Sequence, residues 1–135
     1  MKILQDIWIV EKSGIVIFHR EFDKAVSPQL FGAMMSALNM FSEELAEGGM
    51  SNFELQNSRF TIIKQYDLIF VAISSNKYKQ KKINKELKKV SDKFITLYSE
   101  EIKNFKGQIG HFSNFINEIE DFLEEKPSKS SEQIS

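Results

Sequence analysis

Residues 68–73 read Leu-Ile-Phe-Val-Ala-Ile, an apolar run that no polar side chain interrupts. Continuous apolarity over this length is typical of a strand that is buried on both faces. We therefore predict that this run lies at the centre of a sheet. A sheet that is buried on both faces needs a cover on each side, and helices are the simplest cover.

Two shorter patterns before this run predict two neighbouring strands. Residues 53–56 read Phe-Glu-Leu-Gln, and this alternation indicates a half-exposed strand. Asn57-Ser58 supplies turn residues, and the apolar side chains of residues 60–63 mark the next strand. That strand ends near residues 65–67, so three strands follow one another here.

The chain opens with a pair of strands. Ile7-Trp8-Ile9-Val10 and Ile15-Val16-Ile17-Phe18 are apolar runs on either side of Ser13-Gly14, a pattern typical of a β-hairpin. Both alternation classes are apolar in each run. This hairpin therefore also requires cover on both of its faces.

Three apolar stripes at helical spacing predict the covering helices. Ser27-Pro28 begins the first helix, because serine caps free amides and proline is tolerated at the first position, and Gly48-Gly49 ends it. A long helix begins within residues 74–76 and ends before Gly107, and a last helix follows. Glu101 falls within the apolar stripe of the long helix. Either the helix bends before Glu101, or Glu101 has a buried partner, or the helix frays near Gly107, which is the interpretation we favour. The stripes contain Leu30, Phe31, Met34, Met35, Leu38, Phe41 and Leu45; Ile83, Leu87, Val90, Phe94, Leu97, Tyr98, Ile102 and Phe105; and Phe112, Phe115, Ile116, Ile119, Phe122 and Leu123.

The resulting order, β-β-α-β-β-β-α-α, resembles a longin domain. The resemblance is carried by Asp6–Val10, Gly14–Phe18 and Leu68–Ile73, and it covers residues 3–125. It implies an α+β fold: a five-stranded antiparallel sheet in the order 2-1-5-4-3, with the first helix on one face and the last two helices on the other. Profilin and PAS domains share parts of this plan and remain the alternative.

The resemblance also implies a use. Longin domains are non-catalytic platforms in vesicle trafficking and small-GTPase regulation, and longin and roadblock domains pair through the first helix and the adjoining edge strand. The implied partner is a small GTPase or another longin/roadblock-type subunit, in a homo- or heterodimer. We expect one domain over residues 1–125 and a disordered polar tail over residues 126–135.

Composition argues against several other classes of function. The 18 basic and 19 acidic residues give a net charge of −1, which does not favour a nucleic-acid-binding domain. The chain has no cysteine, so disulfides, thiol catalysis and thiolate metal sites are excluded. His19 and His111 lack metal-ligand spacing, and we interpret both as ordinary surface histidines. We expect no catalytic activity, no cofactor and no metal.

The sequence also contains no stretch long and apolar enough to cross a bilayer and no signal-peptide pattern. We therefore expect a cytoplasmic protein, with peripheral contact to an anionic membrane as one option.

A cluster of lysines stands out in the long helix. Seven lysines lie within residues 77–89, against Glu86 as the one acidic residue. Like charges three and four residues apart repel one another, and positive charge opposes the helix dipole near an N-terminus. The cluster is therefore either a solvated face or a surface for an acidic protein, an anionic membrane or a phosphate. The residues that would form this surface, called the lysine patch below, are Lys81, Lys82, Lys85, Lys88 and Lys89.

The outer face of the first helix is unusually uncharged. Small side chains and a methionine stand where long charged side chains normally face water, which indicates a contact with a partner. The adjoining edge strand is a template for further pairing, which Glu54 and Gln56 only partly block. The helix residues, called the uncharged stripe below, are Gly32, Ala33, Ser36, Ala37 and Met40.

These observations favour a non-catalytic interaction domain that works by presenting its surfaces. The rival is a profilin- or PAS-like sensor that holds a small ligand between helix and sheet. Convergent polar groups inside the core would favour the sensor, and the strand faces show none apart from Thr61 and Lys64.

Overall fold

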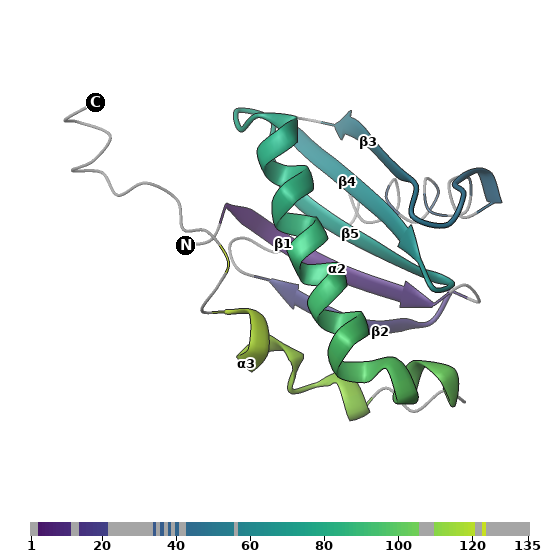
Figure 1. The fold of residues 1–135 in the computed structure, drawn as a ribbon. Helices are drawn as coiled ribbons and strands as arrows, with labels where there is room; N and C mark the ends of the chain where they lie inside the picture. Colours follow the sequence, from purple (N-terminus) through teal and green to yellow (C-terminus); the bar gives the residue numbers. More distant parts are fainter. Residues whose placement is uncertain are drawn as a thin grey trace.

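Five antiparallel strands form one sheet in the order β2-β1-β5-β4-β3 in the computed structural model, which confirms the predicted α+β topology. The predicted central run lies in the middle strand, and every residue from Leu68 to Ser74 is buried. Figure 1 shows α2 crossing one face of this sheet, with β2 and β3 at opposite edges. The elements are β1 (Leu4–Glu11), β2 (Val16–Glu21), β3 (Met50–Leu55), β4 (Ser58–Gln65), β5 (Leu68–Ser75), α2 (Gln80–Lys103), the short 3₁₀ helix η1 (Gly110–Phe112) and α3 (Phe115–Ile119).

Not every residue is described by the structure. The first helix is represented by six helical residues, Met34, Ser36, Leu38, Met40, Glu43 and Glu44. The tail expected over residues 126–135 lies outside the described residues, as do parts of the first helix. The described residues are 3–11, 14–21, 34, 36, 38, 40, 43–55, 57–105, 110–120 and 123.

Each face of the sheet carries its own core, as the both-faces-apolar strands predicted. Met34 and Leu38 of the first helix pack on one face, against Trp8, Phe60 and Val71 among others. The helices α2 and α3 pack on the other face, in a larger cluster that reaches the N-terminal strands. The larger cluster includes Ile7, Ile9, Ile17, Phe18, Phe70, Ile83, Leu87, Val90, Phe94, Phe112, Phe115, Ile119 and Leu123.

An aromatic cluster joins α2 to α3. The ring of Phe94 lies 4.9 Å from that of Phe115, 5.0 Å from Tyr98 and 5.3 Å from Phe112, measured between centroids. It also meets Phe70 of the central strand edge-to-face. Edge-to-face and tilted pairs of this kind add to the energy of burial. The cluster therefore fixes the short C-terminal elements against the sheet.

The long helix differs from its prediction at both ends. It begins at Gln80, because β5 continues through Ser75, which still pairs with Ser58. It bends at Tyr98, whose backbone is non-helical (φ −121°, ψ 23°), and ends at Lys103. The fraying interpretation of Glu101 is therefore wrong, since the bend precedes that residue and turns the last part of α2 away from the original stripe.

Two tight turns set the strand registers. Asn57 stands just before β4 with a positive φ of 69°, as the turn prediction required. Tyr66 and Asp67 join β4 to β5, and both have positive φ, 53° and 61°. Two central residues of positive φ between paired strands form a type I′ turn, which normally uses Asn and Gly. The Glu47 carboxylate holds this turn by accepting the Tyr66 N–H at 2.6 and 2.7 Å.

Burial raises the pKa of Tyr98 above its usual value of 10.0, and the carboxylates of Glu118 and Glu101 raise it further. A raised pKa in the folded state gives stability that is complete below pH 10 and is lost as pH rises through the folded-state pKa. Tyr98→Phe cannot ionise. We expect the urea midpoint of this variant, relative to that of wild type, to increase as pH rises from 9 to 11. Parallel pH curves for the two proteins would contradict this.

Candidate interaction surfaces

The uncharged stripe is described at two of its five positions. Ser36 and Met40 are both exposed, and Met40 exposes 59% of its surface. Met34 and Leu38 alternate with them and are buried, so the helix separates its two faces as the sequence predicted. Gly32, Ala33 and Ala37 lie outside the described residues.

The adjoining strand β3 is an edge of the sheet, as expected. Its Phe53 turns toward the first-helix core, where its ring stacks on that of Phe60 at 4.7 Å. Glu54 consequently faces the opposite side, where its carboxylate lies 3.4 Å from the guanidinium of Arg59. Glu54 and the uncharged stripe therefore share the edge of the sheet but not one face. Gln56 lies outside the described residues.

Arg59 is a buried residue that the sequence interpretation missed. Its side chain is 11% exposed, and Nη1 donates a hydrogen bond to the Tyr78 carbonyl at 2.6 Å. This contact ties β4 to the connection that leads into α2. No local pattern distinguishes Arg59 from a solvated strand residue, because its partners lie in separate elements.

The lysine patch is only partly available to a partner. Lys88 pairs with Asp92 at 3.0 Å, and Lys89 pairs with the buried carboxylate of Glu86 at 2.6 Å. Lys81 and Lys85 are exposed and make no ion pair with a described residue. Lys82 is also exposed. The first two turns of α2 therefore present most of the uncompensated positive charge.

His19 lies at the surface, as the sequence interpretation has it, and it also contacts a buried carboxylate. Its imidazole Nε2 lies 2.6 Å from a carboxylate oxygen of Asp6, whose side chain is 1% exposed. The ring also stacks on Trp8, with centroids 3.7 Å apart and planes 20° apart. Trp8 lies opposite His19 across the β1–β2 pair, so register brings the imidazole to the buried carboxylate.

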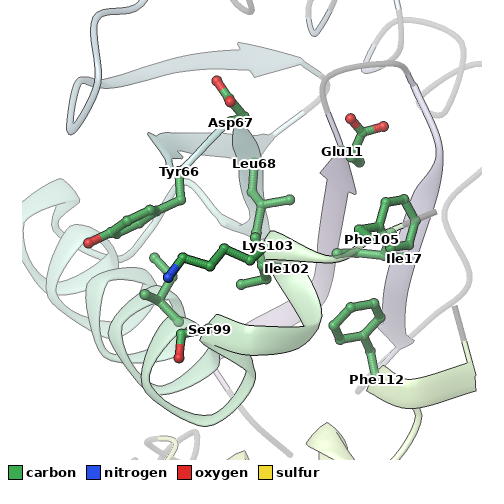
Figure 2. Close-up of a pocket in the computed structure, with 11 residues that line it drawn as sticks. Glu11, Ile17, Tyr66, Asp67, Leu68, Ser99, Ile102, Lys103, Phe105 and Phe112 are labelled. Carbon is green, nitrogen blue, oxygen red and sulfur yellow. The ribbon is translucent and has the colours of Figure 1, made fainter. Parts of the chain in front are cut away.

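A cavity of about 600 Å³ lies where the last turns of α2 meet the ends of β1 and β5. Its described lining is mainly apolar, with a few charged and hydroxyl groups at the rim (Figure 2). The sequence pattern does not predict that these residues line one cavity, since they come from five separate elements. The lining residues are Glu11, Ile17, Tyr66, Asp67, Leu68, Ile95, Ser99, Ile102, Lys103, Phe105 and Phe112.

Within the described part of the chain, no three metal-ligating side chains gather into a site. The His111 side chain lies outside the described residues. Among the helices that are described, none is long and apolar enough to cross a membrane.

A family sequence model matches residues 5–125 of this chain, nearly the whole folded body, and it describes the first longin domain of FUZ, MON1 and HPS1. The chain belongs to this longin family. The expected resemblance is thus confirmed, together with the type of function that it implied: an interaction domain of small-GTPase regulation and vesicle trafficking. The longin domains of this family are regulatory platforms.

Two solved structures share the fold of this longin domain. A chain of the mammalian SRP receptor matches with a TM-score of 0.57 and 17% identity, covering 99% of this chain and 98% of its own. A chain of the signal recognition particle receptor SRβ-GTP/SRX complex from Chaetomium thermophilum matches with a TM-score of 0.50 and 20% identity, covering 85% and 99%. No curated protein sequence matches the chain significantly.

His19→Ala removes the imidazole that contacts the buried Asp6 carboxylate. Loss of this close polar contact with a buried carboxylate, together with the stacking on Trp8, costs about 1–3 kcal/mol. We expect urea unfolding to show this loss at neutral pH. Arg20→Ala, at the exposed neighbouring position of the same strand, is the control and should cost less than about 1 kcal/mol. Equal losses in the two variants would show that the Asp6 contact contributes nothing.

Proposed function

We propose that this longin domain is a non-enzymatic platform that pairs through its first helix and the edge strand β3, and docks a small GTPase or a second longin- or roadblock-type subunit. The family match over residues 5–125 carries the proposal. Support comes from one structural neighbour, which was solved in a complex that contains a GTP-bound subunit. The proposed location is the cytoplasm, where these GTPases act.

The exposed Met40 supports the pairing surface. A methionine that exposes 59% of its surface beside Ser36 offers a flexible apolar contact with no charge to desolvate. Strand β3 follows as the adjoining edge of the sheet. A second subunit would cover the exposed part of Met40 and extend the sheet at this edge.

Met40→Glu and Ser36→Arg test this surface. In a pair, each variant buries a charge without a partner, which costs several kcal/mol. We expect sedimentation at micromolar concentration to show loss of pairing, while thermal melting stays cooperative. Thr96→Arg, at an exposed position of α2 on the other side of the sheet, should pair like wild type.

Two results would count against this surface. A wild type that remains monomeric at high micromolar concentration, alone and with every candidate subunit, would overturn the pairing. A stable pair that tolerates both charges would place the interface elsewhere.

The exposed end of the lysine patch supports attraction of a negatively charged partner. Lys81 and Lys85 lie one turn apart and repel each other, so a partner with acidic groups would relieve a cost that the isolated helix carries. Attraction of this kind mainly raises the rate of association, and salt screens it over about 8 Å at physiological ionic strength.

The double variant Lys81→Glu/Lys85→Glu should lose binding to an acidic protein partner or to anionic vesicles, and wild-type binding should weaken as salt rises. Its fold should survive, because both side chains are exposed. Lys81→Arg/Lys85→Arg keeps the charge and should bind as wild type does. If the affinity of wild type does not change with salt, and the charge-reversed variant binds as tightly as wild type, the lysine patch is only a solvated face.

A direct test of the proposed function uses purified small GTPases loaded with GDP or with a non-hydrolysable GTP analogue. We expect saturable binding that depends on the bound nucleotide, measured by calorimetry with the paired form of the longin domain. Release of a fluorescent nucleotide then shows whether the pair promotes exchange. Absence of nucleotide-dependent binding across the GTPases of the same cell would overturn the GTPase assignment, and hydrolysis by the domain alone would overturn its non-enzymatic role.

A further inference from the structure

The cavity at the end of α2 shares no residue with the uncharged stripe or the lysine patch, so an inference from it goes beyond the proposed function. Its volume of about 600 Å³ falls within the usual range for small-molecule sites, and so does its mixture of an apolar lining with a few polar groups. Two rings, Phe105 and Phe112, line one end with centroids 6.0 Å apart.

The charges around this cavity are unequal. Glu11 and Asp67 contribute two carboxylates, whereas Lys103 contributes the one ammonium group of the described lining. The last turn of α2 adds the partial negative charge of a helix C-terminus. Both carboxylates also make contacts within the protein, but a carboxylate accepts several hydrogen bonds, so a further cation can still approach it. The lining therefore favours a positively charged ligand.

The close-up shows how these groups are arranged. Lys103 extends from α2 toward the side of Tyr66, whereas Phe105 lies beside Ile17 on the side of Glu11 (Figure 2). One end thus combines a carboxylate with aromatic rings and lacks a lysine among its described residues. Aromatic faces attract organic cations, and burial of the alkyl part on the apolar floor would add to that attraction.

The turn at the mouth of the cavity is strained. A left-handed backbone is unfavourable for a residue such as Tyr66, which has no short polar side chain to compensate. The strain holds an aromatic ring that is 61% exposed, and the adjacent Asp67, at the rim. Strain of this kind is concentrated at ligand sites, where the surrounding structure maintains it. Here the Glu47 carboxylate maintains it through the Tyr66 N–H.

We propose that the cavity binds a small apolar organic cation, an alkylamine or an alkyl quaternary ammonium compound. The alkyl part lies on Ile102 and Leu68. The cationic head lies against the phenylalanine rings and the carboxylates of Glu11 and Asp67. The Tyr66 ring closes the rim.

Three probes of equal chain length test the sign of the charge: octyltrimethylammonium, 1-octanol and octanoate, each below its micelle concentration. Amide chemical shifts of the full chain follow the titration and locate the site. We expect saturable shifts at Leu68, Ser99 and Phe105, with octyltrimethylammonium bound at least about fivefold more tightly than octanoate. Absence of saturable shifts at the lining, or tighter binding of octanoate, overturns the proposal.

Three substitutions separate electrostatics from folding. Glu11→Gln and Asp67→Asn should each weaken binding of the cation by about two- to fivefold, and Lys103→Met should strengthen it by a similar factor. Asparagine tolerates the left-handed backbone at position 67, so the turn survives. Asp92→Asn removes an exposed carboxylate of α2 outside the cavity and should leave affinity unchanged. Weaker binding of the cation by Lys103→Met, or equal effects of Asp92→Asn and Asp67→Asn on its affinity, overturns the inference that the lining favours a cation.

Tyr66→Asn distinguishes a role of the Tyr66 ring in binding from a purely structural role of the turn. Asparagine suits this turn type, so thermal stability should be equal or higher. The aromatic ring at the rim is lost, so affinity for octyltrimethylammonium should fall at least about threefold. Unchanged affinity, with higher stability, would show that the strained tyrosine has no part in binding.

Discussion

Burial of the central strand on both faces is the constraint on which the rest of this structure depends. A strand whose residues 68–74 are all buried cannot lie at an edge, so a strand must flank it on each side and a layer must cover each face. The chain meets this requirement by pairing β5 with the neighbouring β4 on one side and with β1, from the N-terminal end of the chain, on the other. The two helical layers then follow from the two apolar cores that this sheet presents.

The division into two layers also divides the surfaces. The face covered by the first helix ends at the edge strand β3, and the exposed Met40 of that helix is accessible to a partner. The opposite face carries α2, whose N-terminal half is basic and whose C-terminal part bends at Tyr98. An interaction domain arranged in this way can engage one partner at its sheet edge and another along its outer helix, since the two surfaces lie on opposite sides of the sheet.

The bend of α2 has a second consequence. A straight helix would continue along the direction set by Ile83, Leu87 and Val90, whereas the bend brings Ile102 and Lys103 to the ends of β1 and β5. The aromatic cluster around Phe94 holds α3 against this part of α2, and its Phe112 also lines the cavity. The family match extends over residues 5–125, whereas the cavity depends on local features of the residues around the bend of α2.

The sequence by itself determined the two covering layers, the central position of residues 68–73 and the faces of the helices, because these follow from the spacing of apolar residues, a local property of the chain. The strand order came from the resemblance to a longin domain, not from this spacing. The spacing predicted the buried positions of Met34 and Leu38 and the exposed position of Met40 correctly. The contact of His19 with Asp6, by contrast, depends on the register between β1 and β2, which pairs Trp8 with His19. The contact of Arg59 with Tyr78 and the gathering of Glu11, Asp67 and Lys103 depend on how separate elements meet, including a helix bend. Only the tertiary structure decided these, because long-range packing, not the spacing along the chain, sets which polar groups share a site.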